Sequence, residues 1–552
     1  MPEEIVPVLV VGGGPVGLAL AGDLGWRGIS CTLIEQSDGS IYQPRMDLVG
    51  VRTMEFCRRW GLVPAVEASP YPRDYAQDNI YLTSLTGHEL GRERFPGIGQ
   101  APPPKESPQR RERCPQNMFD PILRSFAASQ KNVAMHYRAR LVSFTQDSAA
   151  VTATVENADS GVRREVTARF IVGCDGGRSL VRETLGIAMH GNPVLTYTTN
   201  VIFRCPDLLS LHDKGKAYRH IFIGPEGTWS TMVAINGRDE WRFSIIGGAR
   251  QHDYTTDEIA AAIRRAVGRD FAFEILSVLP WVRRELVAER YRNGRGFIAG
   301  DAAHVMSPTG GFGMNTGIGD VVDLSWKLAA VLEGWGGERL LDSYGAERQP
   351  IGARNVTEAS GNLHRMLSVG PHPDLLDDTP QGAAARATVG RVFSETMRRE
   401  WFTLGAHLGY RYEGSPICWP DGSTAPPDNP NSYVPTARPG HRAPHAWLAD
   451  GRSMLDLFGR GFVLLGFGAD AEAATALLTA ARRRGVPMTF AAISEPQIAA
   501  LYGRQFVLVR PDGHVAWRDD RMPDDPLALI DLVSGAAMPA PYRVMAATGN
   551  SV

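Results

Sequence analysis

Three glycines near the start of the chain have a spacing that could bind a phosphate group. Gly12, Gly14 and Gly17 fit the pattern GxGxxG. In this pattern the first glycine allows a tight turn, the second lets a pyrophosphate approach the backbone, and the third lets a helix pack close to a sheet. Glu35 lies 18 residues beyond Gly17, where a carboxylate can accept hydrogen bonds from ribose hydroxyls. These residues indicate a dinucleotide site. The acid argues against a 2′-phosphate, which leaves NAD and FAD open.

The residues on either side of the glycines decide whether the motif indicates a dinucleotide site or a chance match. Glycine supplies 59 of 552 residues, so the pattern arises by chance roughly 0.7 times in such a chain. Residues 6–11 form an apolar, β-branched run, which is typical of a strand buried on both faces. Val16, Leu20 and Leu24 recur at helical spacing, and a second apolar run ends at Glu35. The sequence therefore predicts the strand, turn and helix of a Rossmann-type fold.

Two later segments also run from an apolar stretch into a glycine-containing turn. Asp175 and Gly176 follow the first of them, a pattern that equally suits an ordinary strand, turn and helix. Gly300 and Asp301 follow the second, and a glycine-rich loop over residues 308–316 then opens a long helix. Backbone N–H groups at a helix start can hold negative charge other than phosphate, such as that of a reduced flavin ring.

The composition excludes several classes of protein. Hydrophobic residues make up 43% and charged residues 21%, the net charge is −2, and the length exceeds one ordinary core, so we expect two or three domains. Nothing resembles the basic footprint of a nucleic-acid binder, and we interpret the short arginine runs at 110–113 and 482–484 as solvated surface.

The cysteines and the N-terminal stretch concern redox state and location. The six cysteines show no CxxC and no metal-ligand spacing, so we expect reduced thiols, no metal and a cytoplasmic protein. Residues 5–22 carry no charge, but two prolines and five glycines favour a strand and turn over a membrane helix.

Three segments together resemble a known family. Residues 10–17, 174–179 and 300–316, in this order, are similar to the class A flavoprotein monooxygenases, whose prototype is p-hydroxybenzoate hydroxylase. The phenol-hydroxylase-like subgroup, which includes 2-hydroxybiphenyl, 3-(3-hydroxyphenyl)propionate and polyketide ring hydroxylases, is most similar. The resemblance covers nearly the whole chain. It implies an α/β fold with a Rossmann-like FAD-binding domain of the glutathione-reductase type, an inserted substrate sheet and a C-terminal thioredoxin-like domain.

Patterns elsewhere in the chain suit these domains. Alternation over residues 229–246 predicts a mostly antiparallel sheet, prolines over 415–445 predict a linker, and no CxxC occurs in the expected thioredoxin-like domain. The expected division is a discontinuous FAD-binding domain over 1–75, 105–190 and 285–375, a substrate-binding sheet domain over 76–104 and 191–284, a helical segment and linker over 376–440, and the thioredoxin-like domain over 441–552.

The resemblance implies FAD as the bound cofactor, with O2 and a transient NADPH or NADH as co-substrates. There is no second strand–GxGxxG–helix unit, so the nicotinamide nucleotide is expected to have no domain of its own. The family's FAD-binding positions fall on Gly12, Gly14, Pro15, Val16, Gly17, Glu35, Gln36, Arg45, Gln116, Asp175, Gly176, Gly300, Asp301, Pro308, Gly311, Gly313, Met314 and Asn315.

Asp47 is the candidate catalytic base, because several phenol hydroxylases place a His or Asp at the matching position. The family's flavin C4a-hydroperoxide is an electrophile, and a phenolate supplies more electron density to the ring than a phenol. A general base contributes about 10²- to 10⁴-fold. The alternative is that Asp47 only orients Arg52.

The expected function is NAD(P)H- and O2-dependent hydroxylation of a phenolic or polycyclic aromatic compound. Baeyer–Villiger oxidation or epoxidation of a polyketide-like compound stays open, as does a flavin-binding protein without turnover. The expected partner is a small aromatic substrate, with no nucleic acid and no membrane, and a homodimer is possible.

Overall fold

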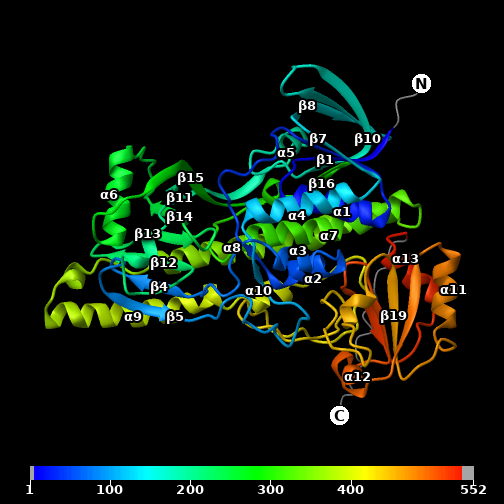
Figure 1. The fold of residues 1–552 in the computed structure, drawn as a ribbon. Helices are drawn as coiled ribbons and strands as arrows, with labels where there is room; N and C mark the ends of the chain where they lie inside the picture. The colour runs from blue at the N-terminus through cyan, green and yellow to red at the C-terminus, as the bar shows by residue number, and fades with distance from the viewer. Residues whose placement is uncertain (1–4, 537–552) are drawn as a thin grey trace, which may run out of the picture. The chain divides into compact units, whose positions relative to one another are not determined.

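The computed structural model describes residues 5–536, which form a mixed α/β fold of two compact units (Figure 1). The first unit comprises the residues up to 325 together with 348–410 and 427–434. The second comprises 326–347, 411–426 and the residues from 435 onward.

A mainly parallel sheet in the first unit carries the glycine motif. Its parallel strands follow the order β17-β10-β1-β2-β7, and β1 fills the centre, where residues 8–10 have no exposed surface. The antiparallel strands β8, β9 and β16 extend it. The prediction of a Rossmann-type strand, turn and helix is confirmed. The strands are β1 (Val6–Val11), β2 (Cys31–Glu35), β7 (Val133–Tyr137), β8 (Ala139–Gln146), β9 (Val151–Asn157), β10 (Arg163–Gly173), β16 (Arg292–Asn293) and β17 (Gly296–Ile298).

Helix α1 (Pro15–Arg27) follows β1 and packs closely on α4 (Gln116–Ser129). A Cβ atom on Gly22 would lie 2.4 Å from the ring of Phe126, so glycine permits this approach. Pro15 occupies the first turn of α1, where its missing N–H leaves no hydrogen bond unmade.

A second sheet in the same unit has the order β18-β15-β11-β14-β13-β12-β4-β5. Neighbouring strands are antiparallel except β12 and β4, so the predicted mostly antiparallel sheet is confirmed. Helix α9 (Pro380–Trp401) lies along β5, as Figure 1 shows. The strands are β4 (Asn79–Leu82), β5 (Glu89–Glu93), β11 (Met189–Arg204), β12 (Arg219–Gly224), β13 (Gly227–Ala234), β14 (Glu240–Ile246), β15 (Glu274–Ala288) and β18 (His304–Val305).

A two-stranded pair and several helices complete this unit. The two-residue strands β3 (Leu48–Val49) and β6 (Glu112–Arg113) pair with each other. The remaining helices include α2 (Val51–Arg59), α3 (Val63–Glu67), α5 (Leu180–Thr184), α6 (Thr256–Val267), α10 (Leu404–Leu408), and parts of α7 (Phe312–Leu332) and α8 (Glu338–Leu367).

The second unit contains a four-stranded sheet in the order β20-β19-β21-β22. Strands β19 and β20 are parallel, and the other pairs are antiparallel. The chain order is strand, helix, strand, helix, two strands and a helix, and the predicted hairpin around residues 511–513 is present. The elements are β19 (Phe462–Phe467), α11 (Thr475–Arg483), β20 (Met488–Ile493), α12 (Pro496–Tyr502), β21 (Phe506–Val509), β22 (Val515–Asp519) and α13 (Pro526–Val533).

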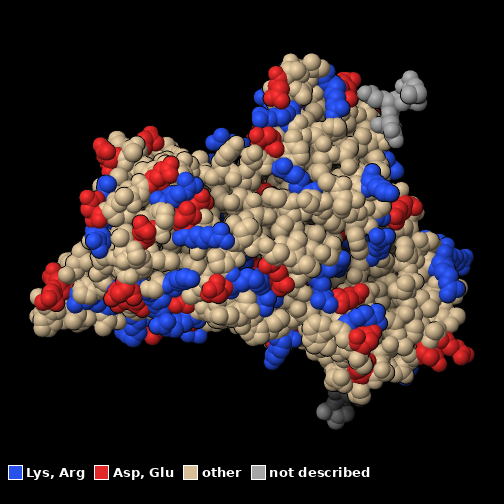
Figure 2. Space-filling view, viewed as in Figure 1, with Lys and Arg blue, Asp and Glu red and all other residues tan. Residues whose placement is uncertain are grey.

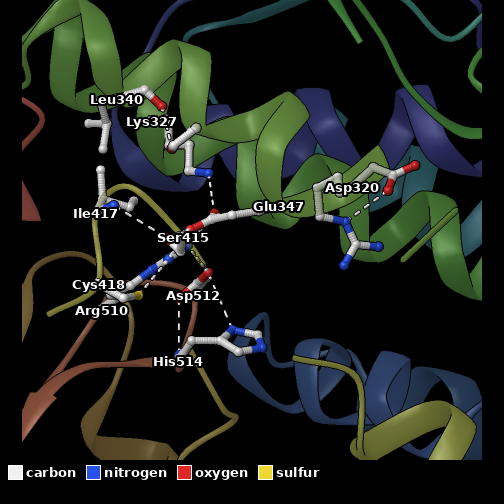
Figure 3. Close-up of polar contacts among 12 residues, drawn as sticks. Asp320, Lys327, Leu340, Glu347, Ser415, Ile417, Cys418, Arg510, Asp512 and His514 are labelled. Atoms are coloured by element: carbon white, nitrogen blue, oxygen red, sulfur yellow. Dashed lines mark hydrogen bonds and ion pairs between the residues drawn. The ribbon is translucent and has the colours of Figure 1, made fainter. Parts of the chain in front are cut away.

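A buried ion network lies within the second unit (Figure 3). The carboxylate of Glu347 accepts hydrogen bonds from Lys327 at 2.5 Å and from Arg510 at 2.5 and 2.9 Å. Arg510 also donates to Asp512 at 2.7 Å. Burial opposes the ionisation of Glu347, but the charges of Arg510 and Lys327 outweigh it and lower its pKa. Each buried charge is thus paired, as the cost of desolvation requires.

The surface bears charges of both signs, and on the face in Figure 2 they are interspersed. Residues 482–484 are exposed, as predicted. The same interpretation of residues 110–113 is wrong, because Arg113 is only 8% exposed and pairs with Asp47. Among residues 5–536, no helix could cross a membrane and no cluster of side chains could hold a metal ion.

Candidate active site

The three predicted motifs meet at the carboxyl ends of the parallel strands. Gly12 follows β1 with φ +108°, and a Cβ there would lie 2.4 Å from the carbonyl oxygen of Cys174, which follows β10. A Cβ on Gly300, after β17, would lie 3.0 Å from Val16 at the start of α1. Because β1, β10 and β17 are parallel, their turns converge at one edge of the sheet, the usual ligand site of such folds.

Gly14 and Gly17 differ in what surrounds them. A Cβ on Gly17 would lie 1.9 Å from the carbonyl oxygen of Gly12, so this glycine lets the helix approach the turn. A Cβ on Gly14 would meet no atom within 4 Å. No contact within the chain therefore requires glycine at position 14. A ligand that approaches the backbone at this position would require it, because a side chain would occupy the same space.

Glu35 is held in place at the end of β2. Its carboxylate accepts hydrogen bonds from the backbone N–H of Gly13 at 2.7 Å and of Ser37 at 2.8 Å. Each carboxylate oxygen can accept a further bond, so ribose hydroxyls remain suitable donors. Gln36 follows as an exposed residue.

Arg45, Gln116 and Asp301 lie near one another although they are far apart in sequence. The backbone N–H of Arg45 donates to the Gln116 side chain at 3.1 Å. Asp301 is exposed, yet the surrounding protein raises its pKa, against the opposing charges of His304 and Arg45. An accessible carboxyl group in such surroundings is suited to accept or donate hydrogen bonds to a ligand's hydroxyl groups.

The glycine-rich loop is anchored by Asn315 at the start of α7. Its side chain accepts from the backbone N–H of Gly50 at 2.8 Å and donates to the carbonyls of Leu48 at 3.0 Å and Gly311 at 2.8 Å. The side chain thus holds the loop against β3. The N–H groups of the first three helical residues, 312–314, have no carbonyl partner in a preceding helical turn and can bind an anion.

The other loop residues predicted to bind FAD have local contacts, and their role in binding stays a prediction. Pro308, which is exposed, accepts a hydrogen bond from the N–H of Gly311 at 3.1 Å, and Gly311 has φ +68°. Met314 is buried, and a Cβ on Gly313 would lie 3.8 Å from Met306.

Asp175 is engaged by its own helix. Its carboxylate accepts from the Ser179 hydroxyl at 2.5 Å and from the backbone N–H of Val181 at 3.2 Å, and burial raises its pKa. Gly176, with φ +81°, completes the turn. The local contacts give Asp175 an ordering role at the start of α5, beside which its predicted role in nucleotide binding stays a prediction.

Asp47 lies immediately before β3, at the centre of a polar group that the sequence did not predict. Its carboxylate accepts from Arg113 at 2.7 Å, from Arg242 at 3.3 Å and from the Tyr218 hydroxyl at 2.5 Å. Burial opposes ionisation, but the charges of Arg113 and Arg242 outweigh it and hold the pKa of Asp47 below its ordinary value. Arg52, the alternative partner, pairs with Glu55 at 2.8 Å.

Glu400 and Arg219 connect the glycine loop to the second sheet. Glu400, on α9, accepts from the backbone N–H of Gly310 at 3.1 Å and from Arg219, on β12, at 2.6 Å. No motif marks either residue. The pairing of β3 with β6 brings residues 112–113 beside the strand that follows Asp47, and no spacing in the sequence indicates this contact.

These observations fit FAD. The open space at Gly14, the positioned carboxylate of Glu35, the accessible Asp301 and the N–H groups at the start of α7 form a donor and acceptor set suited to a nucleotide and a flavin.

Comparison with known proteins gives the class. A model described as FAD binding domain matches residues 5–359, and one described as aromatic-ring hydroxylase, C-terminal, matches 436–534. The chain is 34% identical to 4-methyl-5-nitrocatechol 5-monooxygenase of Burkholderia sp, over 96% of this chain and 97% of that one.

Solved structures share the whole fold. RebC with bound 7-carboxy-K252c is 39% identical with a TM-score of 0.90, over 97% of this chain and 100% of that chain. Aklavinone-11 hydroxylase with FAD and aklavinone is 30% identical with a TM-score of 0.80, at the same coverage.

The fold and site thus define a flavoprotein monooxygenase. This chain belongs to the FAD-dependent aromatic-ring hydroxylase family, binds FAD and hydroxylates aromatic substrates. Membership of this enzyme family argues against the alternative of a flavin-binding protein without turnover.

Asp120 next to the site provides a test of its electrostatics. This buried carboxyl accepts from Gln116 at 3.1 Å, and burial raises its pKa to about 7. Because the folded pKa lies above the unfolded one, the contribution of Asp120 to stability is complete below about pH 4 and is lost as the pH rises through 7. We expect Asp120→Asn to be more stable than the wild type at pH 8 by about 1–3 kcal/mol, with a difference that shrinks toward pH 4. Chemical denaturation across this range measures it, and a difference independent of pH would contradict the raised pKa.

Proposed function

We propose that the substrate is a phenol, simple or polycyclic, and that Asp47 and Tyr218 together accept the proton of its hydroxyl group. The observation that carries this proposal is the 2.5 Å hydrogen bond from the Tyr218 hydroxyl to Asp47. The nitrocatechol that names the Burkholderia relative is itself a phenol. Bound FAD, reduced by NADH or NADPH, supplies an oxygen atom from O2 as an electrophile.

The protein's part is to move a proton. Arg113 binds one oxygen of Asp47, and Tyr218 and Arg242 bind the other. A phenol beside Tyr218 can pass its proton to the tyrosine oxygen while Tyr218 passes its own proton to Asp47. This relay leaves both ion pairs in place, whereas direct contact of Asp47 with the phenol would displace a partner. The lowered pKa keeps Asp47 ionised throughout the neutral range.

A proton acceptor favours hydroxylation over Baeyer–Villiger oxidation or epoxidation. A base beside the substrate hydroxyl promotes hydroxylation directly, because the phenolate activates the ring toward an electrophile. Three further expectations belong to the proposal. The sheet of the second unit is expected to have a thioredoxin-like fold, in keeping with its strand order. A homodimer and a cytoplasmic location are also expected.

Flavin reduction measured by stopped flow tests the substrate class. The holoenzyme is mixed with NADH or NADPH, alone and with phenol, 2-naphthol or 1,8-dihydroxyanthraquinone. We expect at least one phenol to accelerate reduction about 10-fold or more, because reduction that waits for substrate avoids wasteful oxidation. If the rate is unchanged with every phenol and rises with a ketone such as cyclohexanone, the Baeyer–Villiger alternative replaces the proposal.

A further inference from the structure

The segment between β2 and β3 has little backbone support. We call residues 36–46 the cofactor loop, because Gln36 and Arg45 within it, and Glu35 just before it, are predicted to bind FAD. Among the described residues 5–536, no hydrogen bond between two backbone groups involves residues 38–45. A segment that lacks such bonds opens at a lower free energy than a strand or a helix does. The side chains that hold the loop therefore control how often it opens.

Helix α4 holds the loop at two points. Gln116 and Arg124 lie eight residues apart, so they share one face of this helix. The side-chain oxygen of Gln116 accepts from the backbone N–H of Arg45 at 3.1 Å, near the end of the loop. Nη2 of Arg124 donates to the carbonyl oxygen of Gly39 at 2.7 Å, in the half of the loop next to Glu35. One helix face thus fixes both halves of the loop.

Arg124 fits closely against the loop. Its guanidinium group lies over the ring of Tyr137 at 4.4 Å from the ring centre, within the range of a cation–π contact. Gly39 has φ +78°, and a Cβ there would overlap Nη2 of Arg124 and lie 2.6 Å from the ring of Tyr137. Tyr137 pairs in register with Glu35 on the neighbouring strand. Arg124 therefore joins the loop to the strand ends where the ribose is expected to bind.

Further bonds hold the loop from the second sheet. Nε2 of Gln43 donates to the hydroxyl of Ser277 on β15 at 2.8 Å. Nη1 of Arg242 on β14 donates to the carbonyl oxygen of Pro44 at 3.1 Å. Tyr42, next to these two residues, is 82% exposed. The loop is thus fixed from both sides by side chains, and each such bond contributes only about 1 kcal/mol in a typical protein.

We propose that Arg124 is a positioning residue, which holds the cofactor loop closed beside bound FAD, and that FAD leaves the enzyme when this loop opens. Glu35 and Arg45 stand at the two ends of the loop, so a dinucleotide that contacts both runs along it. Arg138 also holds the loop, through an ion pair with Asp38 at 3.2 Å, but its side chain is 48% exposed, and exposed ion pairs contribute little. The shielded contact of Arg124 is therefore the stronger anchor.

Release of FAD from the diluted holoenzyme, followed by FAD fluorescence, tests the proposal. In Arg124→Met we expect release about 10-fold faster or more, the range for the loss of a charged hydrogen bond. Trypsin should cleave after Arg45, an exposed residue of the loop, faster by a similar factor. Arg124→Lys keeps a donor but not the planar group, so its rates should lie between these and the wild type. Arg138→Met is the matched control, and both of its rates should stay within about twofold of the wild type.

A pair of glycine variants tests the loop without any change in α4. In Gly39→Ala the new Cβ overlaps Arg124 and approaches Tyr137, so the loop must move away from both, and FAD release should be faster, as in Arg124→Met. Gly61→Ala is the matched control, because φ is +74° at Gly61 and +78° at Gly39, and a Cβ on Gly61 meets no atom within 4 Å. It adds the same kind of backbone strain and should leave FAD release unchanged.

Three results would overturn the proposal. Unchanged FAD release in Arg124→Met would show that the loop does not depend on this arginine. Faster release with unchanged trypsin cleavage would show that Arg124 acts on FAD directly and not through the loop. Equal release in Gly39→Ala and Gly61→Ala would assign the effect of Arg124→Met to α4. These measurements involve no NADH, NADPH or aromatic substrate, so their outcome is independent of the proposed function.

Discussion

The variant Asp47→Asn is expected to retain FAD and to hydroxylate phenols about 10²- to 10⁴-fold more slowly than the wild type, the range of a general base. Asparagine has nearly the same shape as aspartate but cannot accept the proton that Tyr218 would pass on. The measurement is kcat/KM for the phenol that the wild type turns over fastest, with the flavin absorbance spectrum as the check that FAD is bound.

The pH profile separates a proton acceptor from a residue that only positions its neighbours. The pKa of Asp47 lies below its ordinary value of 3.8, so its ionised form is present above that pH and is lost only in stronger acid. Wild-type kcat/KM should therefore show no acid limb from Asp47 between pH 5 and 8. In Asp47→Asn the rate should rise with pH toward the pKa of the phenol, because the ionised substrate no longer needs a base.

Tyr218→Phe is the matched test of the relay, because it removes one hydroxyl and leaves Asp47 with Arg113 and Arg242. The rate of Tyr218→Phe should rise with pH in the same way as that of Asp47→Asn.

Two results would contradict the role of Asp47. Equal rates in Asp47→Asn and the wild type between pH 5 and 8 would show that Asp47 takes no part in the reaction. A uniform loss at every pH would leave it a positioning residue.

Alanine at two neighbouring glycines is expected to give opposite phenotypes. Gly14→Ala should fold, because its Cβ meets no protein atom within 4 Å, but should bind FAD about 10²-fold more weakly or worse. The reason is that a methyl group at this position holds a pyrophosphate away from the N–H groups at the start of α1, and a charged hydrogen bond is worth about 1.5–3 kcal/mol.

Gly12→Ala should instead destabilise the fold by about 2–5 kcal/mol. Its φ is +108°, and the new Cβ would lie 2.4 Å from the carbonyl oxygen of Cys174, which belongs to the backbone and cannot move aside. Thermal unfolding of the apo-proteins and fluorescence titration with FAD measure the two effects. The control is Gly370→Ala, where open space surrounds the Cβ and both properties should be unchanged.

Full FAD affinity in Gly14→Ala would show that the cofactor does not approach this turn. A stable, FAD-binding Gly12→Ala would show that the contact with Cys174 is less rigid than the structure has it.

The FAD-binding elements could be predicted from the sequence because their signals are local. The run over 6–11, the glycine spacing and Glu35 lie within one strand–turn–helix–strand unit, and each constraint acts on neighbours in the chain. The hairpin around 511–513 and the alternation over 229–246 were predictable for the same reason.

The polar surroundings of Asp47 could not be predicted, because their members meet only through tertiary structure. In the sequence, Arg113 belongs to a short arginine run of the kind expected at a solvated surface. In the structure it lies on the two-residue strand β6, which pairs with β3, and its side chain donates to Asp47. Tyr218 and Arg242 lie on or next to strands of the second sheet, and Glu400 comes from α9. Spacing in the sequence gives no information on which of the chain's many arginines are buried.

Oxygen labelling is the most direct test of the central claim that this chain hydroxylates an aromatic substrate with FAD. The holoenzyme is supplied with NADH or NADPH, ¹⁸O2 and each phenol in turn, and the masses of the products are measured by mass spectrometry. We predict a hydroxylated product that carries one ¹⁸O atom, in an amount that matches the nucleotide consumed. Nucleotide consumption with hydrogen peroxide and unlabelled phenol for every compound, or label found in a ring-expanded ester, would contradict it.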